Sequence, residues 1–207
     1  MGFFDVPPPR RMEFEGEETV PPAWSGPRKD VLGALVPIER VLFRGETLVL
    51  VLTSATVFPE GVDFEVTMGA RRSEGVDDET WWSQRELLMG SHFHLGPDRP
   101  LPEEIERFGV RFSDGSKATI FDGMRQTPEW PPSQPDSPVL LSLHGKSEPG
   151  GRGFVCRSWH LWLWPLPPPE PFEFVVEWPA FDVPLTFTEI DAAPLVSAAT
   201  RAQPFWP

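Results

Sequence analysis

The sequence predicts an all-β protein: an antiparallel two-sheet β-sandwich, jelly-roll or immunoglobulin-like, with one short C-terminal helix. Three observations lead to this fold class. Apolar and polar residues alternate in several short runs, as half-buried antiparallel strands require. The 27 prolines are spread along the chain, which favours many short elements joined by stiff connections. A length of 207 residues, of which 40% are hydrophobic, suits one β domain with its own core.

We expect a single domain formed by residues 35–207 and an extended N-terminal segment, residues 1–34, that packs on it. The sequences Pro7-Pro8-Pro9 and Pro21-Pro22 exclude a regular helix from this segment. We expect its aromatic side chains to pin it to the domain: Phe3, Phe4, Phe14 and Trp24.

The run Leu48–Leu52 contains five aliphatic residues and no polar one. A strand without a polar face is typical of a central position covered on both sides, so we expect its leucines to be buried. Gly45-Glu46 before the run predicts a type II′ hairpin with the strand Ile38–Arg44, because glycine suits the first central position of that turn. Further strands are predicted at 62–68, 108–112, 118–120, 139–144, 154–164, 172–178 and 181–187, with Asp114-Gly115 in a second hairpin turn.

A C-terminal helix is predicted over about residues 191–202. Asp191 suits the N-cap position, and Pro194 falls in the first turn, where its missing N–H costs nothing. Since so short a helix is marginal alone, we expect it to dock on the domain. We also expect the rings of Phe205 and Trp206, which follow it, to cover an edge of the core.

Residues 71–106 leave two structures open. Asp78 suits the N-cap of a short helix, in which Trp81, Arg85 and Leu88 follow a helical spacing. Alternatively, the whole segment is a long loop.

Four stretches share a further pattern: Arg107–Phe112 followed by Asp114-Gly115, Leu161–Pro169, Glu177–Ala180 and Asp191–Leu195. Together they resemble a family of uncharacterised actinobacterial proteins, over roughly residues 24–206. No activity or catalytic residue is established for that family, so the resemblance implies a host lineage and no mechanism. The excess of arginine over lysine agrees with that lineage.

The formal net charge of −13 argues against binding to nucleic acid or to an anionic membrane surface. The N-terminus lacks the cationic and then apolar order of a signal peptide. The longest aliphatic run is far shorter than the ~20 residues of a membrane span. We therefore expect a cytoplasmic protein that binds neither nucleic acid nor membrane. Cys156, the only cysteine, is expected to be a small buried apolar residue.

The segment Ser91-His92-Phe93-His94 is the sharpest local feature. On a strand, His92 and His94 point to the same side, where they could bind zinc or iron if a third ligand joined them. The candidates for a third ligand are Glu86, Glu103, His144 and His160. Spacing fixes none of these, so we favour two loop histidines beside a buried phenylalanine, and we expect no metal or other cofactor.

Nine tryptophans are a high count for this length. Exposed tryptophans on a sheet can stack on sugars or on a peptide, whereas packing in the core buries ~150–250 Å² for each ring. We favour packing for most of them. The side chains that would form a ligand or partner surface are Trp81, Trp82, Trp162, Phe205 and Trp206.

The sequence therefore favours a non-catalytic β-sandwich that acts as a protein-interaction or structural module, with another protein or a second copy as its partner. The support is mostly negative, because no catalytic constellation is complete. Two alternatives stay open. One is a metal-dependent enzyme or metal-binding domain centred on His92 and His94. The other is a carbohydrate- or peptide-binding module that uses surface tryptophans.

Overall fold

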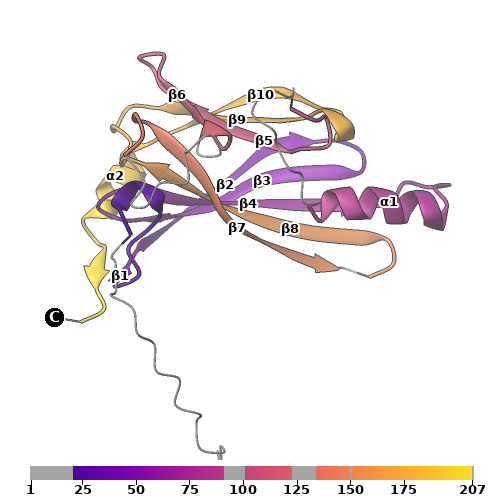
Figure 1. Cartoon of the computed structure of the whole chain (residues 1–207), viewed down its shortest axis with the longest axis horizontal. Helices are drawn as coiled ribbons and strands as arrows, with labels where there is room; N and C mark the ends of the chain where they lie inside the picture. The colour runs from indigo at the N-terminus through magenta and orange to yellow at the C-terminus, as the bar shows by residue number, and fades with distance from the viewer. Residues whose placement is uncertain (1–20, 91–100, 123–133, 150, 207) are drawn as a thin grey trace, which may run out of the picture.

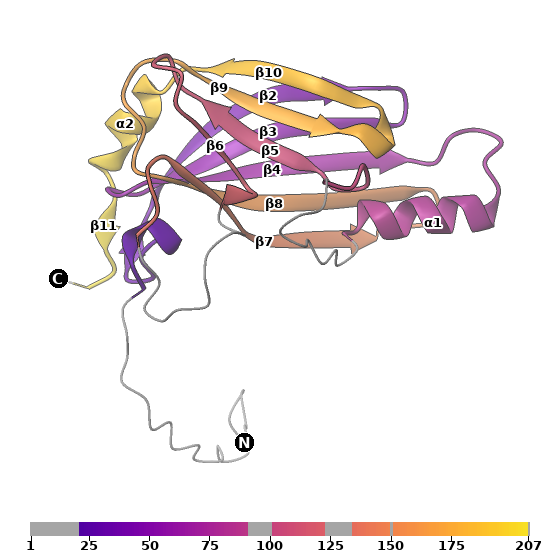
Figure 2. The ribbon, with the colours of Figure 1, turned by 45° about the horizontal axis from the view of Figure 1, so that its top comes forward.

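The computed structural model describes residues 21–90, 101–122, 134–149 and 151–206 (Figure 1). These residues are mostly β, with three antiparallel sheets and two α-helices. A five-stranded and a four-stranded sheet lie face to face as two layers (Figure 2), and a two-stranded ladder lies near the C-terminus. The described strands occur close to where apolar alternation predicts them.

The five-stranded sheet consists, in spatial order, of β2 (Ala34–Arg44), β3 (Leu48–Val57), β4 (Val62–Arg71), β8 (Phe154–Trp164) and β7 (Val139–Pro149). The predicted burial of the β3 leucines is confirmed: Leu48, Leu50 and Leu52 are at most 5% exposed. Val49 and Val51, on the other face of β3, are only half-buried. The expected cover on both sides is therefore wrong, because this face of the sheet points outward.

The hairpin between β2 and β3 is confirmed, but its turn lies one residue later than predicted. The N–H of Gly45 donates to the carbonyl of Leu48 at 2.8 Å, which places Glu46 and Thr47 at the centre of the turn. Glu46 is not among the residues with positive φ, whereas a type II′ turn requires positive φ at that position. The predicted turn type is therefore wrong.

The four-stranded sheet consists of β10 (Val183–Ile190), β9 (Phe172–Trp178), β5 (Arg107–Arg111) and β6 (Lys117–Thr119), and the one-turn helix η3 (Pro179–Phe181) joins β9 to β10. Strand β9 alternates between buried and half-buried residues, as its sequence predicts. The turn between β5 and β6 contains Gly115 with φ 87°, a conformation that glycine adopts readily. The predicted hairpin at Asp114-Gly115 is confirmed.

Aromatic side chains fill the space between the two larger sheets. Phe64 of β4 contacts Phe174 of β9 edge to face, with ring centroids 5.8 Å apart. Phe108 of β5 contacts Trp159 of β8 in the same way at 5.3 Å. All four side chains are at most 2% exposed. Each such pair adds about 0.5–1.5 kcal/mol to the effect of burial, so these rings hold the two layers together.

Helix α1 (Asp78–Leu88) occupies the segment for which the sequence left a helix and a loop open. Its cap is Asp77, one residue before the predicted one; the Asp77 side chain accepts the backbone N–H of Thr80 at 2.8 Å. Trp81 and Leu88 anchor the helix in the core and are 5% and 2% exposed. The described chain therefore has a second α-helix beside the C-terminal one, because a cap and two apolar anchors suffice to hold it.

The C-terminal helix α2 (Ala193–Ala199) is shorter than predicted. Asp191 Oδ1 accepts the N–H of Ala193, the first helical residue, at 3.0 Å, but the N-cap position is held by Ala192, so the prediction of Asp191 as the N-cap is wrong by one residue. Leu195 and Ala198 are 1% and 2% exposed, and the helix packs on β2 and β3. The predicted docking of this helix is confirmed.

The chain after α2 does not return to the core. Strand β11 (Gln203–Pro204) pairs with β1 (Val31–Leu32), and the N–H of Phe205 donates to the carbonyl of Asp30 at 2.9 Å. Phe205 and Trp206 are 52% and 73% exposed. The expectation that both rings cover the core is wrong, because this ladder holds the tail away from the two large sheets (Figure 1).

The described residues just before β1 lie against the outer side of β8. The one-turn helix η1 (Ala23–Ser25) contains Trp24, which is 5% exposed. The carbonyl of Ala23 accepts a hydrogen bond from Trp162 Nε1 at 3.0 Å. The predicted anchoring by Trp24 is confirmed, while the three phenylalanines expected to act with it lie outside the described residues.

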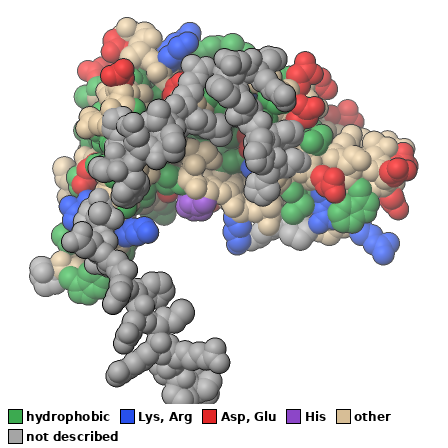
Figure 3. Space-filling view, in the orientation of Figure 1, with side chains coloured by type: hydrophobic (Ala, Val, Ile, Leu, Met, Phe, Trp, Pro, Cys, Tyr) green, Lys and Arg blue, Asp and Glu red, His purple; other side chains and the backbone are tan. Residues whose placement is uncertain are grey.

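Acidic and basic side chains are mixed on the face of the molecule in Figure 3, and hydrophobic side chains lie among them at the end where α1 lies. None of the helices in the described ranges is long and apolar enough to span a bilayer.

Candidate functional site

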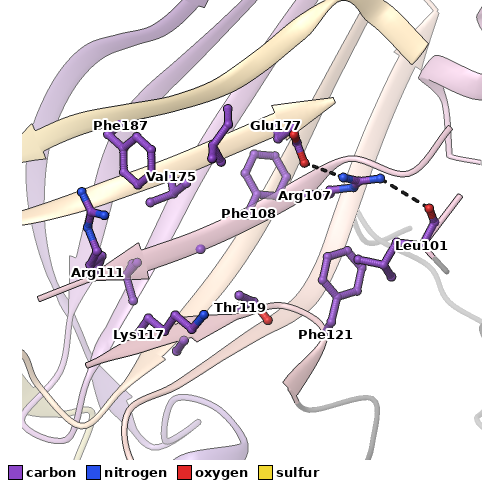
Figure 4. A pocket seen from close by; sticks show the side chains of 14 residues that line it. Leu101, Arg107, Phe108, Arg111, Lys117, Thr119, Phe121, Val175, Glu177 and Phe187 are labelled. Carbon is purple, nitrogen blue, oxygen red and sulfur yellow. Dashed lines mark hydrogen bonds and ion pairs between the residues drawn. The ribbon is translucent and has the colours of Figure 1, made fainter. Parts of the chain in front are cut away.

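The outer face of the four-stranded sheet carries a hollow of about 370 Å³ (Figure 4). One cross-strand row forms its floor: Phe187 of β10, Val175 of β9, Gly109 of β5 and Thr119 of β6 lie side by side. Gly109 has no side chain, so the floor is lowest between Val175 and Thr119. A Cβ at Gly109 would lie 3.1 Å from the carbonyl oxygen of Ala118, which leaves little room for one. Glycine inside a strand often marks a place where another chain or ligand approaches closely.

Exposed apolar side chains form part of the walls of this hollow. Leu185 and Phe187 of β10 are 57% and 41% exposed, and Leu101 is 38% exposed. Phe121, just after β6, lies on the opposite side from β10 (Figure 4). The hollow therefore offers an apolar surface to a guest.

Three cations and one carboxylate line the same hollow: Arg107, Arg111, Lys117 and Glu177. Arg107 Nη1 pairs with Glu177 Oε2 at 2.5 Å, and its Nη2 donates to the carbonyl of Leu101 at 3.4 Å. Arg107 is thus used within the protein, since it links β5 to β9 and to the segment before β5.

Arg111 and Lys117 form fewer hydrogen bonds with the described residues than Arg107 does, although Arg107 Nε also has no partner there. Arg111 lies over the ring of Phe187, 4.3 Å from its centroid, and donates through Nε to Glu173 Oε2 at 2.5 Å. This hydrogen bond lowers the pKa of Glu173 below its ordinary value. Lys117 forms no ion pair with the described residues, and it lies directly opposite Arg111 in the ladder. Glu173 already compensates the charge of Arg111, so Lys117 is the cation that would chiefly attract an anion to this side of the hollow.

The described lining of the hollow consists mainly of apolar and cationic side chains. Its described lining contains no histidine, cysteine, serine or aspartate, and its one carboxylate is paired with an arginine. The Thr119 hydroxyl donates to Asp122 Oδ2 at 3.0 Å. Lys117 is therefore the remaining side chain of the described lining of a type that can serve as a nucleophile or a general base.

The predicted metal ligands His92 and His94 lie outside the described residues. Two of the candidate third ligands do come together: the rings of His144 and His160 stack with centroids 4.3 Å apart. His160 Nδ1 lies 3.0 Å from Asp63 Oδ2, and burial raises the pKa of this carboxyl above its ordinary value. No group of three or more histidine, cysteine, aspartate or glutamate side chains in the described ranges is arranged to hold a metal ion. The metal hypothesis stays a prediction.

Two of the tryptophans predicted for a ligand surface are buried. Trp81 faces the core from α1, and Trp162 is 0% exposed although it lies on the outer face of β8. The ring of Phe58 packs edge to face on Trp162 at 5.8 Å, and the turn at Ala23 covers it. The prediction of surface positions for Trp81 and Trp162 is therefore wrong.

The other three predicted aromatics are exposed, but they do not form one surface. Trp82, which is 58% exposed, lies on α1, while Phe205 and Trp206 lie in the C-terminal tail at the other end of the molecule (Figure 1). The hollow on the four-stranded sheet was not predicted. Its sequence signal is the set Arg107, Gly109 and Arg111, which alternates with the core residues of β5.

No protein-family model, no curated protein and no solved structure matches this chain. The resemblance to an actinobacterial family accordingly stays a prediction.

Proposed function

We propose that this protein is a non-catalytic binding module that holds an extended segment of a partner protein, acidic and apolar in character, in the hollow on its four-stranded sheet. The observation that carries the proposal is the cross-strand row with Gly109 at its lowest point, between exposed apolar and cationic side chains. The apolar walls suit side chains such as phenylalanine or leucine. The opposed cations Arg111 and Lys117 suit a carboxylate.

We further propose that the two facing sheets form a β-sandwich of the jelly-roll or immunoglobulin-like kind. The edge-to-face contacts between the layers and the alternation along β9 support this arrangement. In a sandwich the inner faces supply stability, so the outer face of the four-stranded sheet is free to serve recognition.

Three fluorescein-labelled decapeptides test the proposal by fluorescence polarisation: alternating glutamate and phenylalanine, alternating lysine and phenylalanine, and alternating glutamate and serine. We expect saturable binding of the first peptide. The lysine–phenylalanine peptide should bind at least about tenfold more weakly, because the cations of the hollow repel its lysines. The glutamate–serine peptide should also bind more weakly, because it lacks apolar side chains.

Two variants locate the site. Gly109→Val fills the floor and should weaken binding of the glutamate–phenylalanine peptide at least about tenfold. Gly69→Val is its matched control, because Gly69 also lies inside a strand on an outer face, and a Cβ there meets neighbours at an ordinary 3.4 Å. Lys117→Glu, an exposed change, should shift the preference toward the lysine peptide. Equal affinity for all three peptides, or affinity unaffected by Gly109→Val and Lys117→Glu, would refute the proposal.

A further inference from the structure

A second hollow, of about 520 Å³, lies beside α1 and collects arginines from three parts of the chain. Arg72 follows β4, Arg85 lies on α1, and Arg152 lies in the turn between β7 and β8. Two tryptophans and one aspartate complete its lining: Trp81, Trp82 and Asp78. Figure 3 shows basic and hydrophobic side chains side by side at this end of the molecule.

Among the described residues, an acid pairs with only one of the three guanidinium groups. Arg72 Nη1 pairs with Asp78 Oδ1 at 2.5 Å, and its Nε donates to the carbonyl of Val76 at 2.7 Å. Neither Arg85 nor Arg152 forms an ion pair within the described part of the chain. Acidic residues outnumber basic ones by 31 to 18 in this protein, so two unpaired arginines in one hollow are not explained by a shortage of acids.

Two of the side chains that line the hollow each carry a buried donor that lacks an acceptor among the described residues. Arg85 Nε and Trp81 Nε1 are buried and have no hydrogen-bond partner among the described residues. The Trp81 side chain as a whole is 5% exposed. A buried N–H without an acceptor is unfavourable, and because both nitrogens are closed off from solvent they lie beneath the surface of the hollow.

Trp82 adds an aromatic surface to these cations. Its ring is 58% exposed, and the Arg85 guanidinium lies over it at 4.7 Å from the centroid. This cation–π contact orients Arg85 without neutralising its charge. The first turn of α1 is acidic, with Asp78 and Glu79 after the cap residue Asp77, so the guanidinium groups and not the helix dipole provide the positive potential.

We propose that this arginine hollow, lined by Arg72, Arg85, Arg152 and Trp82, binds a small multivalent oxyanion, a phosphate- or carboxylate-bearing molecule. Planar guanidinium forks match both groups through paired N–H donors. The oxyanion lies between Arg85 and Arg152 and supplies the countercharge that these residues lack. This site is separate from the peptide-binding hollow, and neither proposal depends on the other.

Isothermal titration calorimetry of the full-length chain with pyrophosphate, citrate and inorganic phosphate tests the proposal, with sodium chloride of equal ionic strength as the blank. We expect saturable binding of pyrophosphate or citrate, and weaker binding of inorganic phosphate because it reaches fewer donors. Tighter binding of pyrophosphate assigns the site to phosphate esters, and tighter binding of citrate assigns it to polycarboxylates.

Variants distinguish this site from general attraction to positive charge. Arg85→Gln and Arg152→Gln should each weaken the tighter anion at least about tenfold. Arg40 is an exposed residue of β2, so Arg40→Gln is the matched control and should leave the affinity unchanged. Arg152 lies in an exposed turn, so its variant stays informative even if Arg85→Gln fails to fold. Absence of saturable binding of all three anions, or equal weakening by Arg40→Gln and Arg152→Gln, would overturn the proposal.

Discussion

Removal of the carboxylate of Glu106 should destabilise this protein more than removal of any exposed acid. Glu106 Oε1 accepts from Arg157 Nη2 at 3.0 Å and from Trp159 Nε1 at 2.7 Å. The side chains of Arg157 and Glu106 are 13% and 16% exposed, and burial lowers the pKa of the Arg157 guanidinium. The same guanidinium lies 4.5 Å over the Trp159 ring. One carboxylate therefore satisfies a buried cation and a buried indole together.

The magnitude follows from this double role. Removing one partner of a buried ion pair costs about 3–5 kcal/mol, because a buried charge is left uncompensated. Some exposure remains, so we expect about 3 kcal/mol for Glu106→Ala, which corresponds to a melting temperature about 6–12 °C lower for a chain of this size. Glu106→Gln keeps an acceptor for Trp159 but loses the charge, and should cost less, about 2 kcal/mol.

Urea denaturation at pH 7, followed by tryptophan fluorescence, measures these losses. Glu173→Gln is the matched control for Glu106→Gln, because Glu173 also pairs with an arginine but that pair is 47% and 36% exposed. The control should leave the denaturation midpoint almost unchanged. High salt should reduce the stability of the wild type much less than Glu106→Gln does. Equal midpoints for the two glutamine variants would refute this reasoning.

Two further predictions concern pH and the C-terminal region. Burial, partly offset by His160, raises the pKa of Asp63, so its native state holds a proton more tightly than the unfolded chain does. The stabilisation that protonated Asp63 gives at low pH is then lost as the pH rises from about 4 through the native pKa. In a plot of melting temperature against pH, Asp63→Asn should therefore flatten this range. Equal slopes for the wild type and the variant in this range would contradict the prediction. Leu195→Ala should cost about 2–5 kcal/mol in urea denaturation because Leu195 is 1% exposed. Trp206 is 73% exposed, so Trp206→Ala should change the free energy of unfolding by less than about 0.5 kcal/mol. A larger loss from Trp206→Ala than from Leu195→Ala would show that the C-terminal tail stabilises the fold.

The strands were predictable because their pattern is local. In β9, four apolar residues alternate with the outward-facing Glu173, Val175 and Glu177, and a half-buried strand is the structure that buries the first set and leaves the second partly exposed. The turn at Gly115 was predictable for the same reason, since two adjacent residues suffice to indicate it. These features depend on neighbours in sequence.

The remaining features depend on residues far apart in sequence. Trp162 lies on an outward-facing position, and the turn at Ala23 together with the ring of Phe58 makes it a buried residue. The hollow at Gly109 exists because β9, β5 and β6 align Val175, Gly109 and Thr119 in one row. A one-residue change of register would put these side chains on the other face, and no pattern within one strand fixes the register between strands.

The contact between Ala23 and Trp162 also sets an order in which parts of the chain can fold during synthesis. Ala23 and Trp162 are 139 residues apart, and β8 is the surface on which the η1 turn docks. At about 5–20 residues per second, a ribosome needs roughly 7–28 s to add the second partner after the first. Trp24 therefore leaves the ribosome long before its binding surface exists. The first described residues of the chain are among the last that can reach their native place, and until then their apolar side chains are open to chaperones.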